Sequence, residues 1–298
     1  MTQTPDSELA THSLFKSAPA TTTFEAEKGL RAPFAWYGGK ASHASWLLQH
    51  FPEHRVFIEP FGGAANVLLS KRRSDVEIYN DLDARLANFF RVLRDRKSFD
   101  ELVRLATLTP YSRGEFVQLT LTDEPTEPVE RAWWFFVRAR QAFGGAGMTR
   151  LTACFWATSV RTRRHMAESV SKYLSAIDSL PAIADRFRTV LVESLPAVEL
   201  LAKYDATDAF FYCDPPYLPE TRYLQKATVY GCEMTVEDHE QLLKAVLPLR
   251  GKVMIGGYPS ELYDRVLEGW RKSTRAVKSQ MGNSGEDRTE VIWMNYAE

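Results

Sequence analysis

Six short apolar segments constrain the fold of this chain more than any other feature of its sequence. Each is rich in β-branched or aromatic side chains and is predicted to be a buried strand. The first two are followed by a turn and then by a helical pattern, which is typical of a parallel sheet covered by helices. The predicted strands are Arg55–Glu59, Val76–Tyr79, Thr189–Glu193, Ala209–Cys213, Lys252–Gly256 and Glu290–Met294.

The alternation of strand and helix is interrupted in the middle of the chain. Residues 91–188 are mainly helical in pattern, which predicts a helical insertion within one α/β domain. The start of the chain is rich in Thr, Ser, Ala and Pro, so we expect a disordered tail over residues 1–30. The sheet domain is then predicted to comprise residues 31–90 and 189–298.

The composition excludes several classes of protein. The chain is 45% hydrophobic and 25% charged, as in globular proteins. No apolar run reaches the roughly 18 residues of a membrane helix, and no signal peptide is recognisable at the start. Three cysteines without a C-x-x-C pair argue against a disulfide framework and a structural zinc site. We therefore expect a cytoplasmic protein that holds no metal and does not enter a membrane.

A formal net charge of −1 conceals a basic segment in the predicted insertion. Residues 131–172 contain seven arginines and one lysine but only one acidic residue. Such an excess suits contacts with the phosphates and base edges of a nucleic acid, although a solvated helical face is the alternative. The candidates for contact with DNA in this segment are Arg138, Arg140, Arg150, Arg161, Arg163 and Arg164.

The most specific motif is Asp214-Pro215-Pro216-Tyr217, directly after the predicted strand Ala209–Cys213. Open α/β sheets bind their ligands at the carboxyl ends of their strands. Two consecutive prolines cannot continue a strand and they stiffen the loop that follows. The alternative interpretation is an ordinary turn in which Tyr217 only packs.

Three further motifs are individually weaker. The stretch Glu59–Asn66 (EPFGGAAN) leads from the first strand into a helix, and its glycines would let backbone N–H groups approach a ligand. Asp81 follows the second strand, where an acid commonly accepts hydrogen bonds from ribose hydroxyls, although helix capping is the more frequent role of a lone aspartate. Trp36–Lys40 (WYGGK) precedes the first strand.

In order and placement, these four motifs resemble those of the Dam-like, alpha-arrangement N6-adenine-specific DNA methyltransferases. The closing Arg288–Trp293 (RTEVIW) is similar to that family's last strand. The resemblance implies an α/β fold: a Rossmann-like S-adenosylmethionine-dependent methyltransferase sheet with an inserted, mainly helical target-recognition domain at residues 91–188. One departure is Ala64-Ala65-Asn66, where such loops often have Ala-Gly-Ser.

The resemblance also implies a reaction and its residues. The chain would transfer a methyl group from S-adenosyl-L-methionine to N6 of a flipped-out adenine within a short specific sequence of double-stranded DNA. The implied catalytic residues are Asp214, Pro215, Pro216 and Tyr217. The implied cofactor-binding residues are Trp36, Tyr37, Lys40, Glu59, Pro60, Phe61, Gly62, Gly63, Asn66, Asp81 and Asp214. Arg222 and Lys226, just after the catalytic motif, are candidates for clamping phosphates, with an ordinary surface loop as the alternative.

The chemistry explains why an acid and a rigid loop would be needed. The lone pair of an exocyclic amine is delocalised into its ring, so the amine is a poor nucleophile. The Asp214 carboxylate and the Pro215 carbonyl can accept hydrogen bonds from this amine and stabilise the positive charge that develops on it. The prolines fix both acceptors in place. An amine inside a duplex is out of reach, so the nucleotide must flip out.

Other functions remain open from the sequence alone. An RNA adenine or a cytosine-N4 methyltransferase is the alternative within the same class of enzyme, and Asp214 favours adenine. A catalytically silent DNA-binding regulator on the same scaffold is the alternative outside it, and the intact motifs argue against it. A monomer and a homodimer are both compatible with the sequence.

Overall fold

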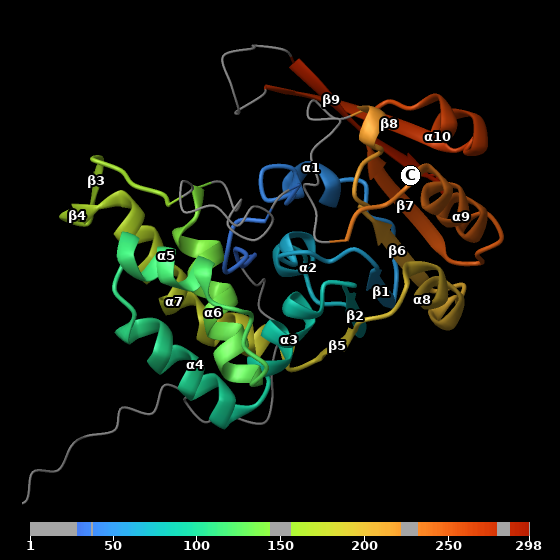
Figure 1. Cartoon of the computed structure of the whole chain (residues 1–298). Helices are drawn as coiled ribbons and strands as arrows, with labels where there is room; N and C mark the ends of the chain where they lie inside the picture. The colour runs from blue at the N-terminus through green and yellow to red at the C-terminus, as the bar shows by residue number, and fades with distance from the viewer. Residues whose placement is uncertain (1–28, 37, 144–155, 222–231, 279–286, 298) are drawn as a thin grey trace, which may run out of the picture.

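A seven-stranded sheet forms the centre of the molecule in the computed structural model (Figure 1). The structure describes residues 29–36, 38–143, 156–221, 232–278 and 287–297. The strand order is β5-β2-β1-β6-β7-β9-β8, parallel except that β9 runs antiparallel to both of its neighbours. The strands are β1 (Val56–Glu59), β2 (Val76–Asn80), β5 (Val190–Glu193), β6 (Ala209–Cys213), β7 (Lys252–Gly257), β8 (Arg271–Lys278) and β9 (Asp287–Met294).

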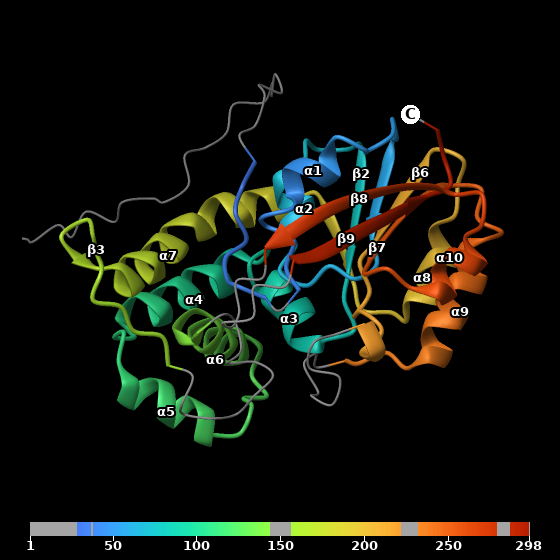
Figure 2. The same ribbon diagram turned by 90° about the horizontal axis from the view of Figure 1, so that it is seen from above.

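Strands β1 and β6, at the centre of the sheet, are buried along their whole length because helices cover both faces of the sheet, as parallel strands require. One face is covered by α8 (Ala197–Tyr204), α9 (Val236–Val246) and α10 (Glu261–Val266). The view from above shows these helices on the opposite side of the sheet from α1 (Ala44–Leu48), α2 (Asn66–Ser70) and α3 (Ala84–Val92) (Figure 2).

A cluster of longer helices lies beside this sheet. It contains α4 (Arg96–Leu108), α5 (Arg113–Leu121), α6 (Pro128–Gln141) and the 20-residue α7 (Glu168–Phe187). At its far end from the sheet is a small hairpin of β3 (Thr162–Arg163) and β4 (Met166–Ala167), visible in both ribbon views (Figures 1 and 2). We call the segment from α4 to α7 the helical region.

The helical region shares its hydrophobic core with one face of the sheet. The Phe34 ring meets the edge of Phe135, from α6, at 5.0 Å and that of Phe89, from α3, at 5.2 Å between centroids. Phe90 stacks on Phe187, the last residue of α7, at 4.1 Å. Aromatic side chains from both parts of the molecule therefore form one continuous core.

A buried ion cluster joins the end of α7 to β2. The Arg186 guanidinium and the Lys71 ammonium both pair with Glu77, and Arg186 Nη2 lies 2.7 Å from Glu77 Oε1. The side chains of Arg186 and Glu77 are each 2% exposed. Buried charges persist only when they are paired and hydrogen-bonded, so this cluster fixes the return of the chain from the helical region to the sheet.

All six predicted strands are present, within three residues at each end, whereas two other features were missed. The edge strand β8 is too polar (RKSTRAVK) to show the apolar run of a buried strand. The two-residue strands of the hairpin are too short to produce any periodic signal.

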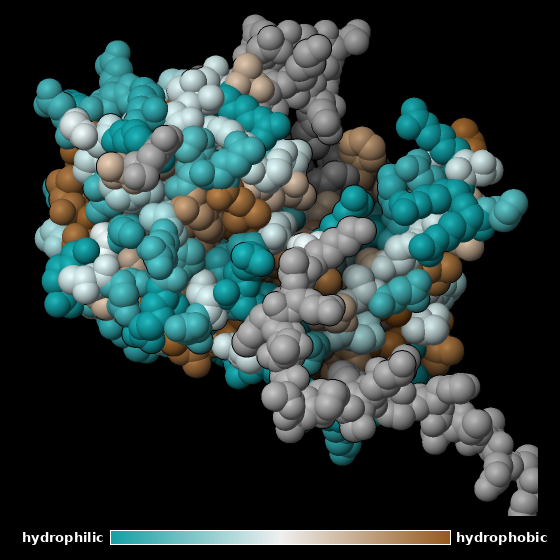
Figure 3. Space-filling view, turned by 180° about the vertical axis from the view of Figure 1, so that it is seen from behind, coloured by the Kyte–Doolittle hydropathy of each residue, from teal (hydrophilic) through white to brown (hydrophobic). Residues whose placement is uncertain are grey.

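In the described part of the chain, no helix is both long and apolar enough to cross a bilayer. Seen from behind, hydrophobic residues form separated patches on a largely hydrophilic surface (Figure 3).

Candidate active site

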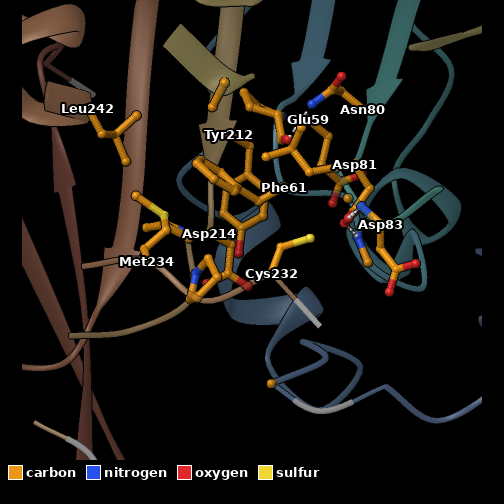
Figure 4. Close-up of a pocket in the computed structure, with 18 of the residues that line it drawn as sticks. Glu59, Phe61, Asn80, Asp81, Asp83, Tyr212, Asp214, Cys232, Met234 and Leu242 are labelled. Carbon is orange, nitrogen blue, oxygen red and sulfur yellow. Dashed lines mark hydrogen bonds between the residues drawn. The ribbon is translucent and has the colours of Figure 1, made fainter. Parts of the chain in front are cut away.

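A cavity of about 530 Å³ lies where the central parallel strands end (Figure 4). The side chains of Glu59, Asp81 and Asp214, from the ends of β1, β2 and β6, line it. Parallel neighbouring strands bring their carboxyl ends to one edge of a sheet, so three acids far apart in the sequence meet there. The motif that ends each of these strands therefore contributes to one pocket.

The loop after β1 needs glycine at two positions. A Cβ on Gly62 would lie 2.2 Å from the ring of Tyr79, so no larger residue fits there. Gly63 has φ +50°, and a Cβ on it would lie 2.8 Å from Trp36 Cδ1. The Gly63 N–H donates to Asp81 Oδ2 at 2.8 Å, which ties the loop to the end of β2. The backbone of the loop is thus pressed against the pocket wall.

Asn80 fastens three segments of the pocket together. Its side-chain amide donates to the carbonyls of Pro60 and Leu195 at 2.8 and 3.0 Å, and its Oδ1 accepts from the Leu195 N–H at 2.8 Å. The Ser194 hydroxyl donates to the carbonyl of Asp81. Asn80 is 1% exposed, so these contacts form a dry clasp that holds the ends of β1, β2 and β5 in register.

Two of the pocket acids are poised to be neutralised or to bind hydrogen-bond donors. Burial raises the pKa of Glu59 well above its ordinary value, and the nearby Asp214 charge raises it further. Glu59 Oε2 is buried without a hydrogen-bond partner among the described residues. Burial also raises the pKa of Asp81 to about 6, despite hydrogen bonds from the Asp83 and Gly63 N–H groups. A ligand that donates hydrogen bonds would satisfy both acids.

Asp214 lies in a cluster with Lys40, Tyr217 and Glu290. Lys40 Nζ is 2.9 Å from Asp214 Oδ1 and 3.8 Å from Glu290 Oε2. It also donates to Tyr217 Oη at 2.6 Å, and the Tyr217 hydroxyl donates in turn to Glu290 Oε2 at 2.6 Å. Lys40, Tyr217 and Glu290 are all less than 8% exposed. The cluster is therefore a connected polar network in a largely dry site.

The charges within this cluster shift one another. Burial lowers the pKa of Lys40, but the carboxylates of Asp214 and Glu290 outweigh it, so the pKa is raised overall. Burial raises the pKa of Asp214, and Lys40 only partly offsets it while Glu290 adds to it. The pKa of Lys40 and that of Asp214 therefore both depend on the charges of the neighbouring groups.

Nearly all of the residues implied for cofactor binding and catalysis line this one cavity. Tyr37 falls outside the described residues. Asp81 does not cap a helix, because Asp83 is the residue that accepts from the first-turn N–H of α3. Those that line the cavity are Trp36, Lys40, Glu59, Pro60, Phe61, Gly62, Gly63, Asn66, Asp81, Asp214, Pro215, Pro216 and Tyr217.

The arginines expected to contact DNA have different surroundings. Arg161, Arg163 and Arg164 are exposed on and beside the β3–β4 hairpin, where they are available to a partner. Arg140 is partly buried and donates to the backbone carbonyl of Lys172 at 2.5 Å. The candidates Arg150, Arg222 and Lys226 fall outside the described residues.

Arg138, which is predicted to contact DNA, is 0% exposed in the described fold. Its guanidinium lies 3.9 Å from the ring centre of Trp134, and burial lowers its pKa to about 10. The place of Arg138 on α6 turns its side chain into the core, where its stem packs within the helical region. Its contact with DNA stays a prediction.

Several residues of the site were missed by the sequence analysis. Glu290 carries a signal in hindsight: it is the one acid at the start of the apolar run EVIWM in β9. The remaining lining residues have no local signal, because they come from separate segments that meet only in the fold. They include Pro196, Ala197, Val198, Tyr212, Met234, Gln241 and Leu242.

The fold and the site together define a class of protein. Numbered along the chain, the strands of the sheet follow the order 3-2-1-4-5-7-6 with the last strand antiparallel, and the pocket lies at the strand ends beside Asp214-Pro215-Pro216-Tyr217. This arrangement is that of a Rossmann-like methyltransferase. Residues 36–278 match the model of the D12 class N6 adenine-specific DNA methyltransferases, and the chain belongs to that family.

Curated relatives agree with the family. The chain is 26% identical over 243 residues to a DNA adenine methylase of Serratia marcescens, a match that covers 78% of this chain and 85% of the relative. It is 23% identical to DNA adenine methylases of Vibrio cholerae and of Escherichia coli, with 94% and 92% of those chains covered. The resemblance drawn from the four motifs is thus confirmed, and the enzyme is an adenine-specific DNA methyltransferase.

Proposed function

We propose that the cavity binds S-adenosyl-L-methionine and that Asp214, Pro215, Pro216 and Tyr217 act on a flipped-out adenine of double-stranded DNA. One observation carries this proposal: Asp214 lines the same cavity as the glycine loop and the acids Glu59 and Asp81. A cofactor and a base would therefore meet at one carboxylate. The methylated adenine would lie within a short specific sequence, which other elements of the chain select.

The residues of the cavity fit this cofactor. Glu59 has a buried oxygen that finds no partner within the described part of the chain, which suits a hydrogen-bond donor such as an ammonium or a hydroxyl. Asp81 lies at the position from which an acid accepts from ribose hydroxyls. Phe61 and Leu242 give the cavity apolar surface for a heterocycle. Gly62 and Gly63 line the cavity without side chains, so their backbone can come close to a ligand.

In the proposed mechanism the protein orients the amine and stabilises its charge. When bound, the cofactor supplies an electrophilic methyl group on a sulfonium. The Asp214 carboxylate and the Pro215 carbonyl accept the two hydrogen bonds of the N6 amine, which concentrates its lone pair on nitrogen. Tyr217 offers a ring face to the base, and the rigid prolines hold both acceptors at a fixed separation.

DNA recognition is assigned to the helical region in this proposal. The exposed Arg161, Arg163 and Arg164 would neutralise phosphates, since arginine pairs well with them. Residues 91–188 would then be the target-recognition domain, although their core is continuous with that of residues 31–90 and 189–298. The enzyme would act in the cytoplasm, associated with the nucleoid through DNA, as a monomer or a homodimer.

The variant Asp214→Ala tests the assignment of the catalytic acid. We expect it to transfer no methyl group to DNA, because it lacks the acceptor for the amine. S-adenosylmethionine should still bind in calorimetry, with reduced affinity, because the other residues of the cavity remain. Circular dichroism checks that the variant is folded. Turnover close to wild type in this variant would reject Asp214 as the catalytic residue.

Modification mapping tests the substrate. We expect long-read sequencing of DNA from cells that lack other methyltransferases to show N6-methyladenine at one short motif when this chain is expressed. N4-methylcytosine at such a motif, or methylation confined to RNA, would show instead one of the other substrates considered above. A chain that binds the cofactor and methylates nothing would be the silent regulator.

A further inference from the structure

Glu290 is a buried acid at the start of the apolar half of β9. The four residues that follow it in β9, Val291–Met294, are all buried and none is acidic or basic. Glu290 itself is 7% exposed, and its Oε2 accepts the hydroxyl hydrogen of Tyr217 at 2.6 Å. Burying a carboxylate is costly unless it serves partners that need it. The partners of Glu290 belong to the catalytic motif.

Lys40 lies between two carboxylates at unequal distances. Its ammonium is 2.9 Å from Asp214 Oδ1 and 3.8 Å from Glu290 Oε2. It also lies 4.5 Å from the centre of the Tyr217 ring. In this arrangement the ammonium pairs with one oxygen of the carboxylate that, in the proposed function, also receives the substrate amine. An amine can use this oxygen fully only when the ammonium has another carboxylate to pair with.

We propose that Glu290 is a positioning residue for methyl transfer. It holds the Tyr217 hydroxyl, and it gives the Lys40 ammonium a second carboxylate, so that Asp214 can turn to the amine of the base. The inference rests on the proposed function, in which Asp214 is the acceptor of that amine. Glu290 touches neither the cofactor nor the base in this scheme and acts through Lys40 and Tyr217.

The direction of Lys40 and Tyr217 hydrogen bonding supports this role. Lys40 donates to the Tyr217 hydroxyl, and that hydroxyl donates to Glu290, so the network has one direction and ends on the carboxylate. Both hydrogen bonds of the chain from Lys40 through Tyr217 therefore lead to one acceptor, the Glu290 side chain.

The variant Glu290→Gln isolates the charge, because its amide oxygen can still accept from Tyr217. We expect kcat to fall about tenfold or more, with KM for DNA and for S-adenosylmethionine changed by less than about threefold. We also expect the acid limb of the kcat profile to move to lower pH. Glu290 raises the pKa of Asp214, so its removal lets Asp214 ionise at lower pH.

Other titratable or charged groups around Asp214 and Glu290 also influence the acid limb of the kcat profile. They come from every element packed against the cluster, and all of them are present unchanged in the variant. These groups are Lys40, His43, Glu59, Tyr212, Cys213, Tyr217, Tyr258 and Arg275. The matched control is Glu261→Gln, an exposed acid on α10, for which kcat and the acid limb stay as in the wild type.

A purely structural role would reduce the folded fraction and leave the acid limb of the remaining enzyme in place. A wild-type kcat in Glu290→Gln, or a reduced kcat with an unmoved acid limb, therefore overturns the inference. If that variant does not fold, Glu290→Asp replaces it, since it keeps the charge but withdraws it from Tyr217. A wild-type kcat in Glu290→Asp likewise overturns the inference, and a reduced kcat supports it.

The variant Asp214→Ala, measured in parallel, separates the two proposals. An inactive Asp214→Ala beside a Glu290→Gln that behaves like the wild type overturns the inference and leaves the proposed function standing. An active Asp214→Ala overturns the proposed function, whatever the result for Glu290.

Discussion

At the scale of single residues, the site depends on acids placed in surroundings that disfavour their charge. Asp81 illustrates this, because its pKa of about 6 lies close to the pH of ordinary assays. Its position after β2 was predicted from the sequence, but its pKa was not, since burial depends on how β1 and β5 flank β2. The consequence is a pocket whose affinity depends on pH.

We expect S-adenosylmethionine to bind more weakly as the pH falls through about 6, because only the ionised Asp81 carboxylate accepts from two hydroxyls. The stability of the ligand-free protein should have the opposite pH dependence. Its carboxyl has a higher pKa when folded than when unfolded, so protonation of Asp81 below about pH 6 favours the folded state. Calorimetric titrations and thermal unfolding across this range measure both trends.

The variant Asp81→Asn serves as the control for this prediction. It should bind the cofactor more weakly near neutral pH, and its affinity should change less with pH than that of the wild type. Equal pH dependence in the two proteins would assign the effect to another group, for which Glu59 is the first candidate because its pKa is also raised.

At the scale of helices and strands, the ends of the elements supply most of the residues that line the site. The strand predictions succeeded because buried parallel strands are short, apolar and β-branched, which a sequence shows directly. The wall formed by α8 and α9 could not be predicted, since nothing in a sequence says which helix ends face one cavity. The conformation of Ala65 could not be predicted either. This residue caps the start of α2 with φ +56°, a left-handed conformation usually taken by glycine.

The position of Ala65 explains why the loop departs from its family's usual residues without losing its shape. The sequence analysis noted Ala64-Ala65-Asn66 where Ala-Gly-Ser is frequent, and the structure shows that the middle residue needs the glycine-like conformation. Alanine has the smallest side chain that carries this cost, about 1–2 kcal/mol. The conformation of the turn is thus kept at the expense of some stability.

The buried ion cluster at the end of α7 leads to a prediction about stability. Glu77→Gln leaves Arg186 and Lys71 buried with no anion between them, so we expect the free energy of unfolding to fall by about 3 kcal/mol. Urea unfolding followed by circular dichroism measures this loss.

The exposed pair of Glu101 and Arg104 on α4 provides the comparison. Glu101→Gln should leave the urea midpoint where it is, because water already solvates both partners. If Glu77→Gln and Glu101→Gln had the same midpoint, the buried cluster would contribute nothing special to the fold.

At the scale of the whole molecule, the pocket and the hairpin belong to different parts. The pocket is lined from the carboxyl ends of the sheet strands, and the hairpin lies at the end of the helical region far from the sheet (Figures 1 and 2). A partner that touches both must extend along the molecule, as a DNA duplex does. The turn of the hairpin is formed by Arg164 and His165, both with positive φ, a strained arrangement of the kind often found at functional sites.

We therefore expect Arg163→Gln combined with Arg164→Gln to weaken DNA binding. The slope of log affinity against log salt should become shallower by about one for each phosphate that the protein no longer neutralises. Fluorescence anisotropy over a series of salt concentrations measures the slope, and turnover at saturating DNA should be retained.

The matched control replaces two arginines of similar exposure on α4. Arg96→Gln with Arg104→Gln removes the same charge at two positions that are not among the candidates for contact with DNA. A slope that changes equally in both double variants would mean that only net charge matters and that the hairpin is not the contact surface.

The shared aromatic core has a consequence for exchanging sequence specificity between related enzymes. Trp36 lines the pocket and packs on Phe135 of α6 at 6.0 Å, and Phe34 contacts the same ring. A chimera joined at residues 91 and 188 would cut across this packing and would inherit mismatched rings directly behind the pocket. Recombination should instead be confined to the hairpin and the surface loops, where a foreign segment can be grafted without disturbing the rings.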